Sequence, residues 1–228
     1  MNKPVLIFGS AEMADMAHFY FSNDSHKVVH GFCVDDNYLT NSSLNGLPII
    51  PFSDAVNKFP PSEFDFHVAL SYKGLNQLRE KKYKQVKSAG YSLISYVSTK
   101  SCVWGNIIMG DNCFILENQV IQPNVIIGNN VMVWSGNHIG HGTTLEDHCY
   151  LSSGIIISGH CRIGARTFVG VSSSIKDFTK IAEDCFIGMG SVITKDMSAG
   201  SVSIAESARI LDANDRRAKM IKNRYFSY

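Results

Sequence analysis

The chain has 228 residues, of which 45% are hydrophobic and 18% charged, and its formal net charge is +1. This is the composition of an ordinary globular protein, without the basic excess typical of nucleic-acid-binding proteins. It has no apolar run of about 18 residues that would span a membrane, and its first apolar run is too short for a signal peptide. The six cysteines form no CxxC pair and no zinc-like spacing with histidine, so we expect a protein of the reducing cytoplasm that needs no metal.

The first hundred residues alternate between apolar runs and helical patterns. Apolar runs at residues 5–8, 28–34, 66–70 and 93–97 predict buried strands, and the segments between some of them, residues 11–21 and 76–89, predict helices. This alternation is typical of a parallel sheet covered by helices. We therefore predict a small Rossmann-like α/β domain over residues 1–100.

Short polar segments follow three of these predicted strands. The first, FGSAEMADMAH, would open a helix, where anions are favoured, but Glu12 and Ala14 stand where a GxGxxG dinucleotide motif has glycines. Parallel sheets bind ligands at the carboxyl ends of their strands. The candidate ligand-binding residues are therefore Gly9, Ser10, Asp35, Asp36, Ser71 and Tyr72. A turn and two loops without any ligand is the alternative interpretation of the same segments.

From Ser101 onward the chain divides into sixteen hexads without an insertion. The third place of each hexad, from Val103 to Ile193, is always aliphatic or Met. A period of six fits neither an amphipathic helix nor a flat sheet. It fits a chain that turns a corner every six residues, so that three hexads form one triangular coil of a β-helix.

The other places of the hexad agree with this geometry. The first place lies two residues before the aliphatic one and should also point inward. Cys113, Cys149, Cys161 and Cys185 occupy this place, so we expect them to be core thiols that act as small hydrophobes. The fourth place is often glycine, which we attribute to tight corners that need a permissive backbone.

The last part of the chain departs from the hexads. Residues 204–226 predict a helix, and Arg216, Arg217, Lys219, Lys222 and Arg224 make it basic. This helix could contact the phosphates of a bound coenzyme A, or it could present a solvated face while it caps the open end of the coils. The predicted domains are thus residues 1–100, 101–200 and 201–228.

The hexads resemble the left-handed β-helix of the hexapeptide-repeat acyltransferases over residues 101–199. Preceded by a small α/β domain, they resemble the bacterial nucleotide-amino-sugar N-acyltransferases, the sialic-acid-type sugar O-acyltransferase family, over residues 4 to about 200. The resemblance implies a homotrimer with active sites between neighbouring subunits. It also implies that the N-terminal domain binds a dTDP-, UDP- or GDP-linked sugar and that the β-helix binds acetyl-CoA or another short acyl-CoA.

The seventh hexad, NHIGHG, contains His138 and His141. His138 occupies the second place and should point outward from its strand, whereas His141 lies at the fifth place, on a corner that could reach a cleft between subunits. The family motif places the catalytic histidine at His141. Imidazole suits this role because an amine that attacks a thioester must lose a proton near neutral pH.

One position departs from the family pattern. In several relatives an acidic residue directly follows the catalytic histidine, but here that residue is Gly142. Glu117, Asn118 or Asp147 could orient the ring instead, the histidine could act without a carboxylate, or the amine could be deprotonated before attack. We also count Asn118 among the substrate-binding residues.

Three hexads make a coil of eighteen residues, so Gly159 should lie directly above His141 and Pro123 directly below it. The backbone N–H of Gly159 is then a candidate donor to the oxyanion that develops on the thioester. By the resemblance, the pantetheine of the acyl-CoA would run past Tyr150, Val171 and Met189.

The function that this resemblance implies is N-acylation of a nucleotide-linked amino-dideoxy sugar by acyl-CoA. We expect the acyl group to be acetyl and the pathway to be the synthesis of surface polysaccharide such as the lipopolysaccharide O-antigen. An O-acetyltransferase acting on a hydroxyl is a second interpretation, since the same fold and base would serve. A trimeric scaffold that binds a sugar nucleotide without catalysis is a third.

Overall fold

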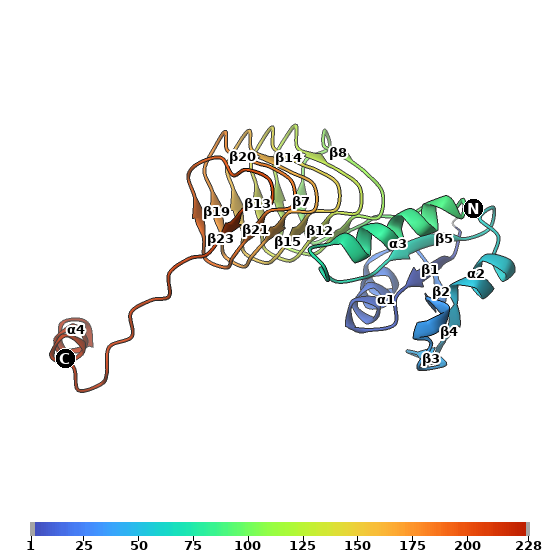
Figure 1. The fold of residues 1–228 in the computed structure, drawn as a ribbon, viewed down its shortest axis with the longest axis horizontal. Helices are drawn as coiled ribbons and strands as arrows, with labels where there is room; N and C mark the ends of the chain where they lie inside the picture. The colour runs from blue at the N-terminus through green and yellow to red at the C-terminus, as the bar shows by residue number, and fades with distance from the viewer. Residues whose placement is uncertain (1–2, 227–228) are drawn as a thin grey trace.

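A computed structural model describes residues 3–226, so residues 1–2 and 227–228 of the outer predicted domains lie outside the described range. Figure 1 shows three parts in chain order: an α/β domain, a stack of coils, and an arm that ends in a helix. The predicted fold class, an α/β domain followed by a parallel β-helix and a C-terminal helix, is confirmed.

The N-terminal domain is built on a five-stranded sheet of order β3-β4-β2-β1-β5. Its strands are β1 (Val5–Phe8), β2 (Val29–Val34), β3 (Ser43–Leu44), β4 (Leu47–Pro51) and β5 (Asp65–Val68). All neighbouring strands are parallel except the β3–β4 pair at the edge. The helices are α1 (Glu12–Asp24), η1 (Asp36–Tyr38), α2 (Phe52–Lys58) and α3 (Gln77–Ser88).

Two details of this domain differ from the prediction. The sequence patterns did not predict β3, β4 and α2, and the two prolines of β4 explain why, because proline is uncommon inside sheets. The run at residues 93–97 forms only the short strand β6 (Tyr96–Val97), which pairs with the β-helix rather than with β5. Leu93 retains a single bridge to Phe66.

The β-helix consists of two-residue strands in three parallel sheets. The first sheet contains β7 (Cys102–Val103), β10 (Val120–Ile121), β13 (His138–Ile139), β16 (Ile156–Ile157), β19 (Ser174–Ile175) and β22 (Val192–Ile193). The second contains β8 (Ile108–Met109), β11 (Ile126–Ile127), β14 (Thr144–Leu145), β17 (Arg162–Ile163) and β20 (Lys180–Ile181). The third contains β6, β9 (Phe114–Ile115), β12 (Met132–Val133), β15 (Tyr150–Leu151), β18 (Phe168–Val169), β21 (Phe186–Ile187) and β23 (Val202–Ser203).

The strand register follows the hexads. His138 pairs with Val120 below it and with Ile156 above it, which is one coil of three hexads in each direction. Along the coils the third-place side chains from Ile115 to Ile193 are buried in one continuous core. The first-place cysteines Cys113, Cys149, Cys161 and Cys185 lie in the same core, as predicted.

Our explanation of the fourth-place glycines, that they turn tight corners with a permissive backbone, is wrong. None of these glycines has a positive φ; instead, a Cβ at Gly164 would lie 2.4 Å from the carbonyl carbon of Ala182 in the next coil. The left-handed backbone occurs at the sixth place, for example at Asn130 (φ 56°) and Phe178 (φ 59°). The fourth place therefore needs glycine for close approach between coils, and the corner itself is turned two residues later.

The α/β domain and the first coils of the β-helix share one hydrophobic cluster. Phe21 of α1 and Phe114 of β9 pack together in it, with ring centroids 6.4 Å apart. Beside them, the carboxylate of Asp24 accepts hydrogen bonds from the Thr99 side chain and from the Tyr96 hydroxyl at 2.6 Å. These bonds hold the pKa of Asp24 well below its usual range. The two domains are therefore joined by both apolar packing and hydrogen bonds.

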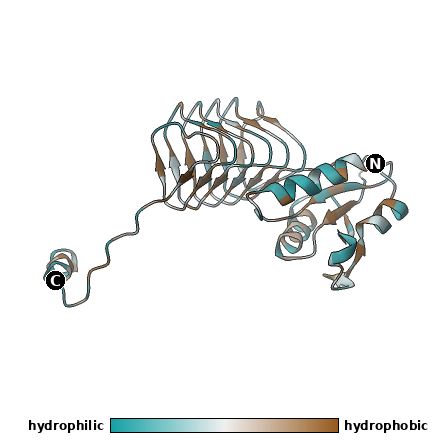
Figure 2. Cartoon of the chain, viewed as in Figure 1, coloured by the Kyte–Doolittle hydropathy of each residue, from teal (hydrophilic) through white to brown (hydrophobic). Residues whose placement is uncertain are grey.

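The C-terminal helix α4 (Arg216–Phe226) begins later than predicted, because residues 204–215 run as an extended segment. Figure 1 shows α4 at the end of this arm, away from the last coils of the β-helix. In Figure 2 the β-helix strands are largely hydrophobic in colour, whereas α3 is largely hydrophilic. None of the described helices has the length and hydrophobicity needed to cross a bilayer.

Candidate active site

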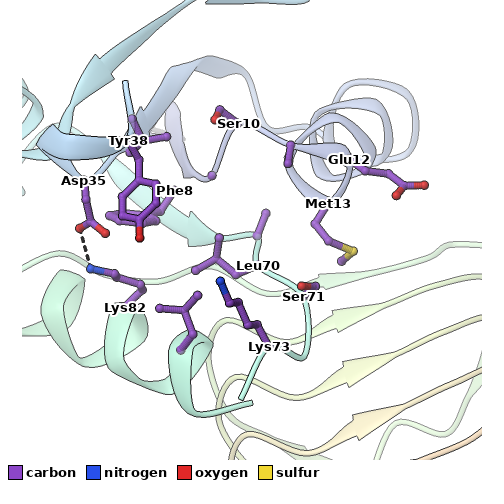
Figure 3. Close-up of a pocket in the computed structure, with 15 residues that line it drawn as sticks. Phe8, Ser10, Glu12, Met13, Asp35, Tyr38, Leu70, Ser71, Lys73 and Lys82 are labelled. Atoms are coloured by element: carbon purple, nitrogen blue, oxygen red, sulfur yellow. Dashed lines mark hydrogen bonds and ion pairs between the residues drawn. The ribbon is translucent and has the colours of Figure 1, made fainter. Parts of the chain in front are cut away.

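A cavity of about 370 Å³ opens at the carboxyl ends of β1, β2 and β5, where parallel sheets bind their ligands. Four of the predicted residues line it, namely Gly9, Ser10, Asp35 and Ser71. Figure 3 shows these segments converging on the cavity, with Ser10 and Met13 at the start of α1 on one side and Leu70 and Lys73 on the other. The predicted ligand-binding crevice therefore exists as a cavity.

Gly9 fits the turn between β1 and α1 for two reasons. Its φ is +137°, and a Cβ there would lie 2.6 Å from the carbonyl oxygen of Ala69 after β5. Any side chain at this position would push the two loops apart. The glycine thus keeps the first turn of α1 close to β5 and leaves the floor of the cavity open.

Two of the charged side chains that line the cavity form an ion pair at one side of it. Lys82 of α3 lies 2.6 Å from the carboxylate of Asp35 and sits over the ring of Phe8 (Figure 3). Because Lys82 is buried and Asp35 is half-buried, the pair is held in a fixed geometry. Lys73 lines the opposite side and is exposed. An anionic ligand can therefore find a positive charge at Lys73 and a fixed carboxylate acceptor at Asp35.

The other two predicted residues of this domain lie outside the cavity. Asp36 faces a neighbouring depression, where its carboxylate accepts a hydrogen bond from the Ser53 backbone N–H at 3.3 Å. Tyr72 instead packs its ring edge against Tyr150 and Phe168 of the β-helix, with centroids 5.1 and 5.0 Å away. Each of the two directly follows a residue that lines the cavity, but its side chain points in a different direction.

His141 lies on the corner that follows β13, and its side chain is exposed, as predicted for a residue at the fifth place. Its Nδ1 is 3.1 Å from the side-chain oxygen of Gln122, one coil below. On its other side the ring meets His160 edge-on at a centroid distance of 4.8 Å. His160 in turn stacks on Phe178 at 5.0 Å. Three rings from successive coils thus gather at this corner.

Gly159 lies directly above His141, in agreement with the predicted spacing. A Cβ at Gly159 would come within 2.8 Å of the His141 ring, so only glycine leaves the ring in place. The N–H of Gly159 donates no hydrogen bond within the described part of the chain. The corresponding N–H of His141 is bound by the side chain of Gln122, but the residue equivalent to Gln122 one coil higher is Gly140, which has no side chain. A free backbone donor therefore lies beside the histidine ring.

Gln122 and His160 were not among the predicted site residues. Both lie in other hexads than NHIGHG, Gln122 at the fourth place of QVIQPN and His160 at the sixth place of IIISGH. The spacing of one coil could have identified both, because His160 lies eighteen residues after Gly142 and Gln122 eighteen before Gly140. Contact across coils, rather than proximity in sequence, brings them to His141.

The remaining predicted acyl-CoA residues lie at a different corner of the coil. Val171 and Met189 are exposed beside a largely apolar depression of about 590 Å³, which also includes Tyr150. Tyr150 itself is 3% exposed and stacks on Phe168, so most of its ring belongs to the core between the domains. Within one chain the structure therefore separates these residues from His141 and Gly159.

Two of the three residues considered as orienting partners of His141 are engaged elsewhere in the chain. Glu117 accepts a hydrogen bond from Tyr20 at 2.8 Å, and Asp147 accepts one from the backbone N–H of Asn129 at 2.7 Å. Asn118 is exposed, and its φ of 60° marks the corner after β9. None of them contacts His141 within the described chain.

The cysteines of the β-helix core lack the properties of nucleophiles. Burial raises the pKa of Cys113 to about 11 and that of Cys149 to about 12, so both remain protonated thiols at neutral pH. No cluster of His, Cys, Asp or Glu with the arrangement of a metal site occurs among residues 3–226.

Fold and repeats together define a hexapeptide-repeat protein in which a β-helix follows a small α/β domain. Residues 106–141 match the model of the bacterial transferase hexapeptide, and residues 160–195 match that of the hexapeptide repeat of succinyl-transferase. The predicted resemblance is thus confirmed for the repeat and for the fold. A search of curated protein sequences gives no significant match.

Several solved structures share the whole architecture. PerB from Caulobacter crescentus, solved with CoA and GDP-perosamine, has a TM-score of 0.77 at 21% identity, over 87% of this chain and 92% of its own. The acetyltransferase domain of PglB from Neisseria gonorrhoeae, solved with acetyl coenzyme A, has a TM-score of 0.78 at 22% identity, over 89% and 96%. WeeI from Acinetobacter baumannii has a TM-score of 0.69 at 20% identity, over 92% and 100%.

Proposed function

We propose that this protein is an acyltransferase that moves an acyl group, most simply acetyl, from acyl-CoA to the amine of a nucleotide-linked amino sugar. The observation that carries the proposal is the exposed ring of His141 beside the free N–H of Gly159. A base and an oxyanion donor at one corner are the two groups that acyl transfer from a thioester needs. The fold shared with PerB and the PglB domain, whose structures contain CoA or acetyl-CoA, supports the same chemistry.

In the proposed reaction the amine nitrogen attacks the thioester carbonyl carbon and a C–N bond forms. The proton lost from nitrogen passes to His141, and the N–H of Gly159 donates to the oxyanion of the tetrahedral intermediate. Collapse of the intermediate breaks the C–S bond. The departing CoA thiolate then takes up a proton, which leaves the amide and free CoA as products and restores the neutral imidazole.

The N-terminal cavity is the proposed site of the nucleotide. Ser10 and Lys73 would contact its phosphates, and the Asp35 carboxylate would accept a hydrogen bond from the ribose or the base. The ligand of PerB, GDP-perosamine, is an amino sugar linked to a nucleotide, which supports this class of substrate. GDP, UDP and dTDP would each present the same two phosphates to the turn after β1. These contacts therefore do not distinguish the three nucleotides, and the assay below includes all of them.

A second copy of the chain would complete the site. His141 and the apolar depression near Val171 occupy different corners of one coil, so an acyl-CoA that lies along the depression meets the histidine of a neighbour. Exposed apolar residues on the sheet that contains β13, such as Ile156 at 52% and Val192 at 73%, support such packing. We propose a homotrimer in the cytoplasm, acting in surface-polysaccharide synthesis.

The experiment that tests this function is a thiol-release assay with acetyl-CoA and a panel of GDP-, UDP- and dTDP-linked 3-amino and 4-amino sugars. We expect release with one of these amines and none with the matching hydroxyl sugars. Release with a hydroxyl sugar alone would make the protein an O-acetyltransferase. Absence of both turnover and CoA binding would overturn the proposal in favour of a scaffold.

The base is tested by His141→Asn, which should lower kcat roughly 10²–10⁴-fold while substrate binding is retained. His138→Asn is the matched control, since His138 lies on β13, three residues before His141, and points out from the sheet. Equal turnover of the two variants would exclude His141 as the base.

A further inference from the structure

Gln122 occupies the fourth place of its hexad, directly below Gly140, and its side chain reaches toward the corner of His141. Its Oε1 lies 2.9 Å from the backbone nitrogen of His141 and 3.1 Å from the Nδ1 of the same residue. Gln122 is half-buried between the coils. Two contacts to one residue fix the amide more firmly than a single contact would.

These two contacts determine which ring nitrogen of His141 carries the proton. A backbone N–H is always a donor, so the Gln122 atom that it contacts must be the oxygen of the amide. That oxygen can only accept, and therefore the Nδ1 that faces it must carry a hydrogen. In the neutral ring Nε2 is then left with the lone pair.

We propose that Gln122 is the positioning residue of His141, which holds the ring in the tautomer whose Nε2 is free to accept the proton of the substrate amine. This inference rests on the proposed function, because it assigns the role of the base to that nitrogen. Gln122 would take the orienting role that the residue after the histidine plays in several relatives and that Gly142 cannot play here. In this role Gln122 acts through the His141 ring, which it contacts at Nδ1.

An amide differs from a carboxylate in this role because it carries no charge. It orients the ring and selects the tautomer, but it stabilises the imidazolium less than an anion at the same distance would. The other titratable group that faces the ring in the described chain is His160, whose ring meets it edge-on. The substitution of Gln122 by Glu therefore adds the one negative charge in contact with this ring.

The chain contains a matched structural control. Glu146 is at the fourth place of a hexad in another sheet, and its carboxylate accepts a hydrogen bond at 3.1 Å from the backbone N–H of Ala165. The residue spacing is the same as between Gln122 and His141, but Ala165 has no ring. Glu146→Met thus removes the same kind of bond between coils, together with an ion pair to the exposed Arg162, without affecting a histidine.

The test compares Gln122→Met, Gln122→Glu and Glu146→Met in the full-length protein. ¹⁵N NMR of histidine-labelled protein should show the Nε2-free tautomer of His141 in the wild type and a mixture in Gln122→Met. We expect kcat of Gln122→Met to fall roughly 10–100-fold with KM changed less than about twofold. Glu146→Met should keep both values. In Gln122→Glu the acid limb of the kcat/KM profile should move upward by about one pH unit.

An unchanged tautomer in Gln122→Met, or a mixture of tautomers with unchanged kcat, would overturn the inference. The NMR measurement does not depend on turnover, so it separates this result from a failure of the proposed function. If His141→Asn were fully active while the tautomer still depended on Gln122, His141 would not be the base, but Gln122 would still position its ring. A fall in kcat shared equally by Glu146→Met would show a merely structural bond.

Discussion

The buried imidazole of His67 makes the stability of the protein sensitive to acid. It lies on β5 in contact with the rings of Phe21 and Phe114, at 5.1 and 5.3 Å, and its Nδ1 is 3.0 Å from the carbonyl oxygen of Ile94. Burial lowers the pKa of His67 from 6.5 to about 4, because the charged ring would lose its hydration. His67 is therefore neutral in the folded protein at pH 6, while the unfolded chain is already partly protonated.

The free energy of unfolding should therefore fall as the pH is lowered from 6.5 to 4, since the unfolded chain binds a proton that the folded chain does not. The loss from this residue reaches about 3 kcal/mol at the lower end. His67→Asn keeps a donor for Ile94 but does not titrate, so its stability should decline less over the same range. Urea unfolding at several pH values measures both curves. Parallel curves would contradict the assignment.

The glycine above the histidine ring gives a second prediction at this scale. A methyl group at Gly159 would lie 2.8 Å from the Cε1 of His141, which forces the ring to move. We expect Gly159→Ala to lower kcat by at least about 10-fold because the base is displaced, with little change in the thermal midpoint. Gly105 occupies the same corner row, and a Cβ there meets nothing within 4 Å. Gly105→Ala should leave kcat unchanged, and a fall of equal size would refute the steric explanation.

At the scale of the elements, the hexads predicted the β-helix because each strand and each corner is determined by residues six apart. The inward places from Cys113 to Ile193 follow from this local pattern alone. The site was less predictable. Gln122 reaches His141 only through the stacking of coils, and the path after β2 turns Asp36 away from the cavity that Asp35 lines. Such details depend on the direction of a side chain in a loop, and the six-residue period of the sequence does not predict that direction.

The two glycine places of a coil should respond differently to substitution. Gly154 is at a sixth place with φ +69° and only the Ser172 Oγ near, at 3.5 Å, whereas a Cβ at Gly164 would meet backbone. Asparagine tolerates the left-handed region, as it does at Asn130. We expect Gly154→Asn to change the free energy of unfolding by less than about 1 kcal/mol and Gly164→Asn to lower it by about 3 kcal/mol or more. Denaturant unfolding of both variants measures the difference, and equal losses would show that close approach between coils does not limit the fourth place.

At the scale of the whole molecule, the α/β domain and the β-helix meet at a buried junction of apolar and polar side chains. Arg79 of α3 is buried there, and its guanidinium donates to the carbonyl oxygens of His148 and Cys149, both at 3.0 Å. Phe114 of β9 is enclosed by aromatic rings from the α/β domain. The relative placement of the two parts is therefore rigid, although the sequence patterns described each part separately and contained no signal for their interface.

This junction predicts that both domains unfold in a single transition. Phe114→Ala removes a 3%-exposed ring shared by the two domains, and it should lower the free energy of unfolding by about 3–5 kcal/mol in one step. Phe186 is the matched control, because it has the same place in the same sheet but is 38% exposed and stacks on Phe168 of the β-helix. Phe186→Ala should lower the free energy of unfolding by about 1 kcal/mol.

Fluorescence of the two tryptophans, which both lie in the β-helix, and far-ultraviolet circular dichroism of the whole chain would follow the transitions. We expect the fluorescence and circular dichroism curves to coincide for the wild type and for Phe186→Ala. Separate transitions in the wild type would show that the shared cluster does not couple the unfolding of the two domains.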